Sequence, residues 1–200
     1  MLILFVLLSI VLGIAIVSAI AFPYLYRIVY RKKYHEIFGQ KLYRLAMNRD
    51  YYLINRLVLK SRDASRFVID HLMFGNKFIY AFYDFYCEES LYGKSTDNSF
   101  LIRGKKTNSY TDNPAIIAKQ RIKELSILIG LDESLFVPIA LVNNTCDFID
   151  YDDNNSIVYL RKITKVIDEY EKKNVNPLNQ EQMMYAVHDI SCINLRDKKE

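Results

Sequence analysis

The 200-residue chain has little cysteine, and its three cysteines, Cys87, Cys146 and Cys192, lie far apart. An odd and scattered set excludes a complete disulfide framework and favours a reducing compartment. The chain has no CxxC motif and no spacing of His and Cys that indicates a zinc site. It also lacks internal repeats and low-complexity tracts, so its length suits one membrane segment and one compact domain.

Charge is missing from the first 22 residues, MLILFVLLSIVLGIAIVSAIAF. As a helix they would span roughly 33 Å, at about 1.5 Å per residue, which is enough to cross the hydrocarbon core of a bilayer. A cleaved signal peptide normally has a basic residue before a shorter apolar run, and this segment has neither feature. We therefore predict an uncleaved anchor. Because Ala19-Ile20-Ala21 resembles a cleavage site, a secreted domain that has lost residues 1–21 is a further alternative.

Four basic residues follow the apolar segment: Arg27, Arg31, Lys32 and Lys33. Positive charge beside a membrane helix favours the cytoplasmic side. We therefore expect a single-pass protein of a bacterial-type cell membrane, with its N-terminus outside and its domain in the cytosol. The predicted organisation is a transmembrane anchor and juxtamembrane flank over residues 1–30, followed by a domain over residues 34–200.

The net charge of +4 comes from the same flank. The chain has 27 Lys and Arg against 23 Asp and Glu, so removing the four flanking basic residues leaves 23 against 23. A domain that binds phosphates usually carries its own excess of positive charge. The neutral domain is therefore weak support for a nucleic-acid ligand and leaves a protein partner open as well.

The rest of the chain alternates between strand and helix patterns. Gly75-Asn76 predicts a hairpin turn, and Asn113-Pro114 is typical of a helix start, with Gly130 as its stop. The order predicts an α/β fold, in which an N-terminal transmembrane helix precedes a mixed β-sheet flanked by helices. The expected strands are residues 51–60, 66–74, 77–86, 98–103, 135–142 and 156–160. The expected helices are residues 34–48, 114–129, 161–173 and 179–193, and the expected loops are residues 104–113 and 147–155.

Two aspartates, Asp70 and Asp84, stand inside the predicted hairpin FVIDHLMFGNKFIYAFYDFY. The string Ile69-Asp70-His71 before the hairpin turn, followed later by Asn113-Pro114 at a helix start, resembles the nuclease-related domain family, called NERD. The resemblance covers about residues 36–160. It implies a fold similar to the restriction endonucleases, of the PD-(D/E)xK type.

Several positions depart from the family pattern. Glu36 matches the Glu that the family has in its first helix. Phe82, however, falls at the Glu position of the family's Glu-x-Lys motif, Asp84 falls at its Lys position, and Ile117 stands where the family has Gln. Such a nuclease needs two carboxylates on a divalent cation and a positive charge beside the scissile phosphate. Phe82 offers no metal ligand and Asp84 would repel the phosphate, so the resemblance implies a degenerate site.

Two functions fit this pattern. The first is a catalytically inactive NERD-like domain, anchored through residues 1–22, that binds a protein or a nucleic acid at the cytosolic membrane face and needs no cofactor. Asp70 is then a leftover or structural carboxylate, the latter bonded to backbone amides, and His71 is a surface or packing residue. The alternative is a divergent Mg²⁺-dependent nuclease of DNA or RNA. It has Glu36, Asp70 and Asp84 as catalytic residues and the two aspartates as metal ligands, in a strand register different from the one counted above.

Overall fold

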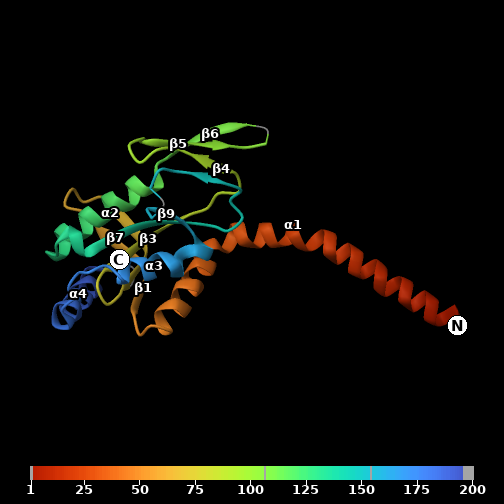
Figure 1. Cartoon of the computed structure of the whole chain (residues 1–200), viewed down its shortest axis with the longest axis horizontal. Helices are drawn as coiled ribbons and strands as arrows, with labels where there is room; N and C mark the ends of the chain where they lie inside the picture. The colour runs from red at the N-terminus through yellow and green to blue at the C-terminus, as the bar shows by residue number, and fades with distance from the viewer. Residues whose placement is uncertain (1, 106, 154, 196–200) are drawn as a thin grey trace.

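A long helix and an α/β domain make up the computed structural model of the chain (Figure 1). The structure describes residues 2–105, 107–153 and 155–195, and for residues 2–9 it describes the backbone alone. Met1 of the predicted anchor and residues 196–200 of the predicted domain lie outside the described residues. The described elements confirm an α/β chain with a long apolar N-terminal helix and mixed sheets flanked by helices.

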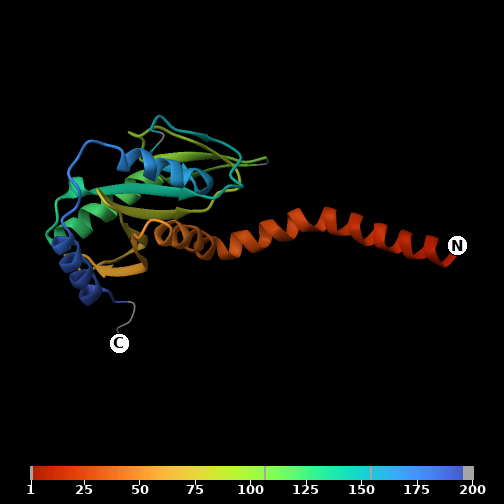
Figure 2. The ribbon, with the colours of Figure 1, turned by 60° about the horizontal axis from the view of Figure 1, so that its bottom comes forward.

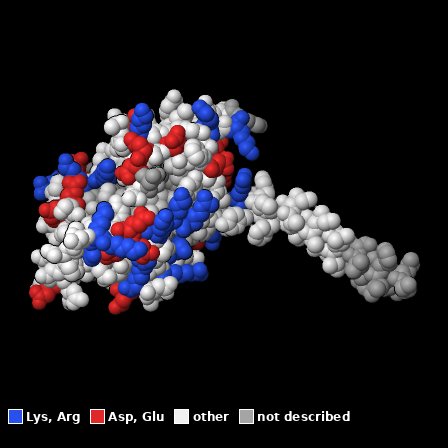
Figure 3. Space-filling view, in the orientation of Figure 1, with Lys and Arg blue, Asp and Glu red and all other residues white. Residues whose placement is uncertain are grey.

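Helix α1, Leu2–Met47, joins the predicted anchor and the predicted helix 34–48 into one element. It bends at Lys33, whose φ of −123° and ψ of 17° are not helical. Between Ile10 and Val29 its large apolar side chains are exposed. By length and composition this part is able to cross a membrane, a property that it shares with signal sequences. Its described surface in Figure 3 is bare of charge beyond the basic flank, whereas charges of both signs cover the visible face of the domain.

The part of α1 nearest the domain packs on the sheet. Its buried residues recur at intervals of three or four positions along most of this part, which places them on one face of the helix. They are Tyr30, Phe38, Leu42, Leu45 and Ala46. This face shares a core with Tyr80 and Phe82 of the sheet.

The larger sheet has the strand order β1-β2-β3-β7-β9. Neighbours among β1 (Tyr52–Lys60), β2 (Arg66–Phe74) and β3 (Ile79–Phe85) are antiparallel, while β7 (Phe136–Val142) pairs parallel with both β3 and β9 (Ile157–Tyr159). A parallel pair requires a crossover connection, and the chain between β3 and β7 includes helix α2 (Pro114–Ile129). The result is the mixed sheet that the sequence predicted.

Helices cover both faces of this sheet. Alternate side chains of β3 enter different cores, as the two-residue period of a strand requires. Tyr80 and Phe82 pack with α1 and with α3 (Ile163–Glu171). Ile79 and Ala81 pack with α2 and with α4 (Gln180–Ile193). Helix α4 lies at the end of the domain opposite the N-terminal part of α1 (Figures 1 and 2).

A smaller sheet, with the order β6-β5-β4-β8, corrects two loop predictions. The predicted loop 104–113 contains β6 (Asn108–Asp112), and the predicted loop 147–155 contains β8 (Ile149–Asp150). Strand β6 is polar and mostly exposed, so no alternation of apolar residues marked it. Its order comes from backbone pairing with β5 (Ser99–Arg103), which in turn pairs with β4 (Ser90–Tyr92). Short 3-10 helices occupy Glu133–Leu135 and Leu160–Lys162.

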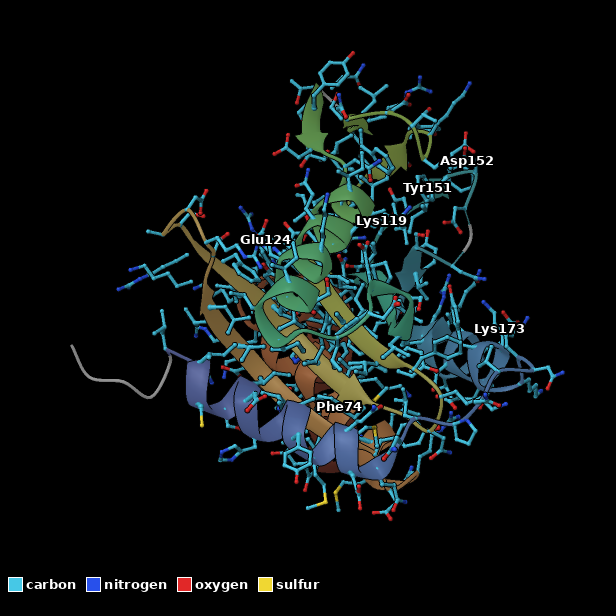
Figure 4. The ribbon with its side chains drawn as sticks, turned by 90° about the vertical axis from the view of Figure 1, so that its left-hand side faces the viewer. Phe74, Lys119, Glu124, Tyr151, Asp152 and Lys173 are labelled. Atoms are coloured by element: carbon cyan, nitrogen blue, oxygen red, sulfur yellow. The ribbon has the colours of Figure 1, made fainter. Side chains whose placement is uncertain are left out.

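Figure 4 shows helix α4 and the smaller sheet at opposite ends of the domain. Phe74, at the end of β2, lies beside α4, whereas Tyr151 and Asp152 lie beside the smaller sheet. Lys119 and Glu124 mark helix α2, which passes between these regions. The smaller sheet therefore sits at the opposite side of the domain from α4.

Asn113 fixes the start of α2 to the smaller sheet. Its side chain is 1% exposed, and its Oδ1 accepts hydrogen bonds from the N–H groups of Ala115 (3.0 Å) and Ile116 (3.4 Å). Its Nδ2 donates to the carbonyl oxygen of Asp97 at 2.8 Å. The residue is thus both the predicted N-cap and a link between α2 and the chain that leads into β5.

We predict that Asn113→Ala lowers the free energy of unfolding by about 1–2 kcal/mol, because the helix loses its cap. Asn113→Ser is the matched control, since its hydroxyl is also an N-cap acceptor, and both variants lose the Nδ2 donor to the carbonyl oxygens of Asp97 and Lys94. Urea unfolding of the full chain in non-ionic detergent measures both variants. A Ser variant that is as unstable as the Ala variant would show that the cap contributes nothing.

Candidate metal centre

Asp70 lies where the pairing of its strand is interrupted on both sides. The β2–β3 register runs from Phe74↔Ile79 to His71↔Phe82 and stops there. On the other side, Asn55↔His71 and Leu57↔Ile69 are paired, but Arg56 and Asp70 between them are not. Asp70 has no partner in either ladder, and its carboxylate accepts a hydrogen bond at 3.1 Å from the backbone N–H of Asp84. The two carboxylates are thereby brought together.

Asp84 has a fully buried side chain that two imidazoles contact. Its Oδ2 lies 2.8 Å from Nδ1 of His35 and 3.1 Å from Nε2 of His71. His71 in turn has its Nδ1 2.7 Å from Oδ1 of Asn55. The other carboxylate oxygen of Asp84, Oδ1, is buried and has no hydrogen-bond partner among the described residues. A buried carboxylate oxygen without a donor is costly, so a ligand at this position would be stabilising.

His35 completes a group of three potential metal ligands. It comes from α1, two residues after the bend, and its side chain is 54% exposed. Its Nδ1 also lies 3.8 Å from Oδ1 of Asp70. One ligand atom each of His35, Asp70 and Asp84 lie within 4.8 Å of one another. One imidazole and two carboxylates at this spacing form a donor set suited to a divalent cation.

A glycine lets α1 come close to these residues. A Cβ atom at Gly39 would lie 3.1 Å from Cε1 of His71, which is tighter than ordinary packing allows without movement of the ring. Gly39 lies one helical turn beyond His35 and on the same face. The missing side chain therefore permits His35 of α1 and His71 of β2 to reach the same carboxylate.

The electrostatics of the centre follow from burial and from the close carboxylates. Burial raises the pKa of Asp70, and the charge of Asp84 raises it further, whereas the Asp84 N–H, Arg121 and His35 oppose the rise. The hydrogen bond to Asp84 raises the pKa of His35, with partial burial acting against it. Two acidic groups that repel each other would both be stabilised by a bound cation.

The centre opens into a cleft with a volume of about 1000 Å³. Two arginines line it. Nη1 of Arg121, from α2, lies 3.5 Å from Oδ2 of Asp70, and its guanidinium carbon lies 4.4 Å from the centre of the Tyr83 ring. Arg56 is exposed and has a φ of 55°, a left-handed conformation that is unfavourable inside a strand. Such strain is often found at functional sites.

The residues predicted from the sequence are distributed as follows. Asp70 and Asp84 meet in the centre, and Asp70 also accepts the backbone amide that the structural interpretation expected. Glu36 lines the cleft but its side chain is 66% exposed, and it lies 3.5 Å from Lys33. Phe82 is buried in the core beneath α1 and does not line the cleft. Asp84, rather than Phe82, is therefore the β3 residue beside Asp70, a register different from the one counted from the turn.

The sequence did not identify Arg121 and His35 as residues of this cleft. Ile117 of α2 is not among the cleft residues, whereas Arg121, one helical turn further on, is. His35, next to Glu36 in the sequence, points at the carboxylates. The signal that was available is the spacing of His35, Gly39 and Tyr43, which share one face of α1 and line the cleft.

Comparisons of the chain with protein-family models, with curated proteins and with solved structures found no match.

We predict a pH-dependent contribution of His35 to stability in the metal-free protein. Because its pKa is raised in the folded state, the charged imidazole stabilises the fold below its ordinary pKa of about 6.5, and this contribution is lost as the pH rises through the raised value. In EDTA, His35→Gln should therefore lose more stability at about pH 6 than at about pH 8.5.

Urea unfolding of the full chain at the two pH values measures this difference. The control is His188→Gln, because His188 is exposed on α4, where it contacts Cys192 and neither aspartate. A His35→Gln effect that is the same at both pH values, or larger at the higher one, contradicts the pairing with Asp84.

Proposed function

We propose that this chain is a membrane-anchored, NERD-like domain that holds a divalent cation at Asp70, Asp84 and His35 and binds the phosphodiester backbone of a nucleic acid in the surrounding cleft. The observation that carries the proposal is the convergence of the three side chains, whose ligand atoms lie within 4.8 Å of one another. The orphaned Oδ1 of Asp84 and the raised pKa of Asp70 both support a cation at this point.

The donor set favours a particular class of metal ion. Carboxylates suit Mg²⁺, Ca²⁺ and Mn²⁺, whereas an imidazole suits Zn²⁺ and other transition metals. Asp70, Asp84 and His35 together therefore favour Mn²⁺ or Zn²⁺ over Mg²⁺. His71 is a positioning residue, because it contacts Asp84 and is itself held by Asn55. A bound cation would supply a Lewis acid for a phosphate oxygen.

The cleft offers groups that suit a single-stranded nucleic acid. Arg56 and Arg121 provide positive charge on either side of the carboxylates, and guanidinium groups bind phosphates well. Tyr34, Tyr43 and Tyr83 also line the cleft. Tyr43 is exposed and offers a stacking surface for a base, whereas Arg121 covers the Tyr83 ring and His35 packs against Tyr34. None of the described cleft residues is a lysine, which favours binding without cleavage over the nuclease reaction.

The membrane anchor and the fold belong to the same proposal. Residues 1–22 would span the membrane, with Arg27, Arg31, Lys32 and Lys33 at its cytosolic face. Support comes from the exposed apolar surface of α1 and from three free cysteines in the described domain. A restriction-endonuclease-like fold is supported by the mixed sheet, in which a hairpin precedes a helical crossover to a parallel strand.

A second candidate is the divergent nuclease. It is favoured by the open cleft around the carboxylates and by the exposed imidazole of His35 at its edge. In this reading Asp70, Asp84 and His35 hold the cation, the arginines orient the phosphodiester, and Glu36 at the cleft margin is a further acidic group. The two candidates differ only in whether the bound polymer is cut.

We predict that the full chain in non-ionic detergent binds one Mn²⁺ ion, measured by isothermal titration calorimetry. Asp84→Asn should weaken binding by more than about 100-fold, and His71→Gln by roughly 10–100-fold, the range typical of residues that orient a ligand. Glu36→Gln is the control and should bind as the native chain does, since Glu36 faces Lys33. Equal losses for Glu36→Gln and Asp84→Asn would contradict this assignment of ligands.

We predict that short fluorescein-labelled single-stranded DNA and RNA bind the chain in the presence of Mn²⁺ and remain intact. Arg56→Gln should weaken binding of all sequences alike and reduce the slope of log affinity against log salt by about one. Arg62→Gln, in the turn between β1 and β2 and outside the cleft, is the matched control. Cleavage that disappears in Asp70→Asn establishes the nuclease, and failure to bind either polymer contradicts both candidates.

A further inference from the structure

Two buried cysteines lie beyond the carboxyl ends of two interior strands of the larger sheet. Cys87 follows β3 and Cys146 follows β7, and these strands are parallel neighbours whose last register pair is Phe85↔Val142. The two chain segments therefore leave the sheet side by side. Cys87 is 5% exposed and Cys146 is 4% exposed.

Both thiols contact the same backbone atom. Sγ of Cys87 donates to the carbonyl oxygen of Glu89 at 3.3 Å, and Sγ of Cys146 donates to that oxygen at 3.1 Å. Because both sulfur atoms lie within 3.3 Å of one oxygen, they are near each other. The third cysteine, Cys192, lies exposed on α4 and contacts His188 instead.

A buried asparagine holds the two segments in place. Oδ1 of Asn143 accepts from the N–H of Cys87 at 2.7 Å, and its Nδ2 donates to the carbonyl oxygen of Cys87 at 2.6 Å. The N–H of Cys146 donates to the carbonyl oxygen of Asn143 at 3.3 Å. Asn143 is fully buried, so the position of each cysteine backbone is fixed relative to the other.

We propose that Cys87 and Cys146 are an oxidative modification site that forms an internal disulfide with hydrogen peroxide. The sulfur of Cys87 attacks one peroxide oxygen and breaks the O–O bond, which gives a sulfenic acid and, after proton transfer, water. The thiol of Cys146 then displaces the sulfenic hydroxyl as a second water. The two thiols are oxidised by two electrons, and one peroxide is reduced to two waters.

The contacts of the two thiols assign the order of these steps. Sγ of Cys146 donates toward two carbonyl oxygens, those of Glu89 and Phe148, which hold its proton, whereas Sγ of Cys87 faces that of Glu89 alone. The hydrogen bond from Cys146 lowers the pKa of Cys87, whereas burial opposes this change. The pKa of Cys146 is raised, first by its hydrogen bond to Cys87 and then by burial. The thiolate is the nucleophilic form, so Cys87 reacts first and Cys146 resolves the sulfenic acid. Hydrogen peroxide is small, which suits a pair of thiols that are almost fully buried.

The test is a map of the cysteines in the full native chain in non-ionic detergent. After treatment with hydrogen peroxide, free thiols are alkylated under denaturing conditions, and the digest is analysed by mass spectrometry. We expect the Cys87 peptide linked to the Cys146 peptide, with a loss of two hydrogen atoms and with release by a reductant. Cys192→Ser is the matched control and should give the same link.

Two results would overturn the proposal. One is that Cys87 and Cys146 are recovered only as alkylated thiols or as separate sulfinic acids, and the other is that either cysteine is linked to Cys192. A second measurement uses Cys146→Ser, which keeps a hydrogen-bonding hydroxyl in place of the thiol. In this variant, dimedone added together with the denaturant is expected to trap a sulfenic acid on Cys87, because no resolving thiol is present, and a Cys87 without an adduct contradicts the assigned order.

Discussion

The close approach of two acidic side chains is the constraint on which the candidate centre depends. Asp70 and Asp84 come together because the ladder between β2 and β3 ends at His71 and Phe82. The Asp70 carboxylate then accepts a hydrogen bond from the N–H of Asp84, beyond the end of that ladder. The repulsion that results is offset by donors on every side: a backbone amide, an arginine and the imidazole of His35.

Helix α1 connects this centre with the segment proposed to cross the membrane. Its bend at Lys33 lies between the exposed apolar part, which ends at Val29, and most of the part that packs on the sheet. His35 is positioned immediately after that bend, while Phe38 and Leu42 bury the neighbouring face of the helix in the core. The absence of a side chain at Gly39 completes the fit against His71. One helix would therefore supply both the proposed anchor and a proposed ligand.

Much of the fold was predictable because it depends on local patterns. Composition and turn residues predicted the hairpin of β2 and β3, the N-cap at Asn113 and the apolar strand β7. Strand β6 did not, because it is polar and gains its order from β5 alone. The centre was only half predictable. Asp70 and Asp84 were identified, but a count from the turn put Phe82 at the Glu position of the family motif and Asp84 at its Lys position. The end of the β2–β3 ladder, which brings Asp84 to Asp70, cannot be seen in one sequence.

His35 illustrates the same limit from the side of the helix. Glu36 and His35 are adjacent, and which of them faces the sheet depends on the rotation of α1 about its axis. That rotation is set by the packing of Phe38 and Leu42, which are fully buried, and by the close contact at Gly39. Tertiary packing thus decides that His35, and not the adjacent Glu36, contacts the two carboxylates.

The most direct measurement is anomalous X-ray diffraction from crystals of the full chain soaked in Mn²⁺. The account predicts one strong anomalous peak within bonding distance of Asp70, Asp84 and His35, with Oδ1 or Oδ2 of Asp84 among its ligands. A peak held by Glu36 without Asp84, or an ordered centre with no peak at saturating Mn²⁺, would contradict it.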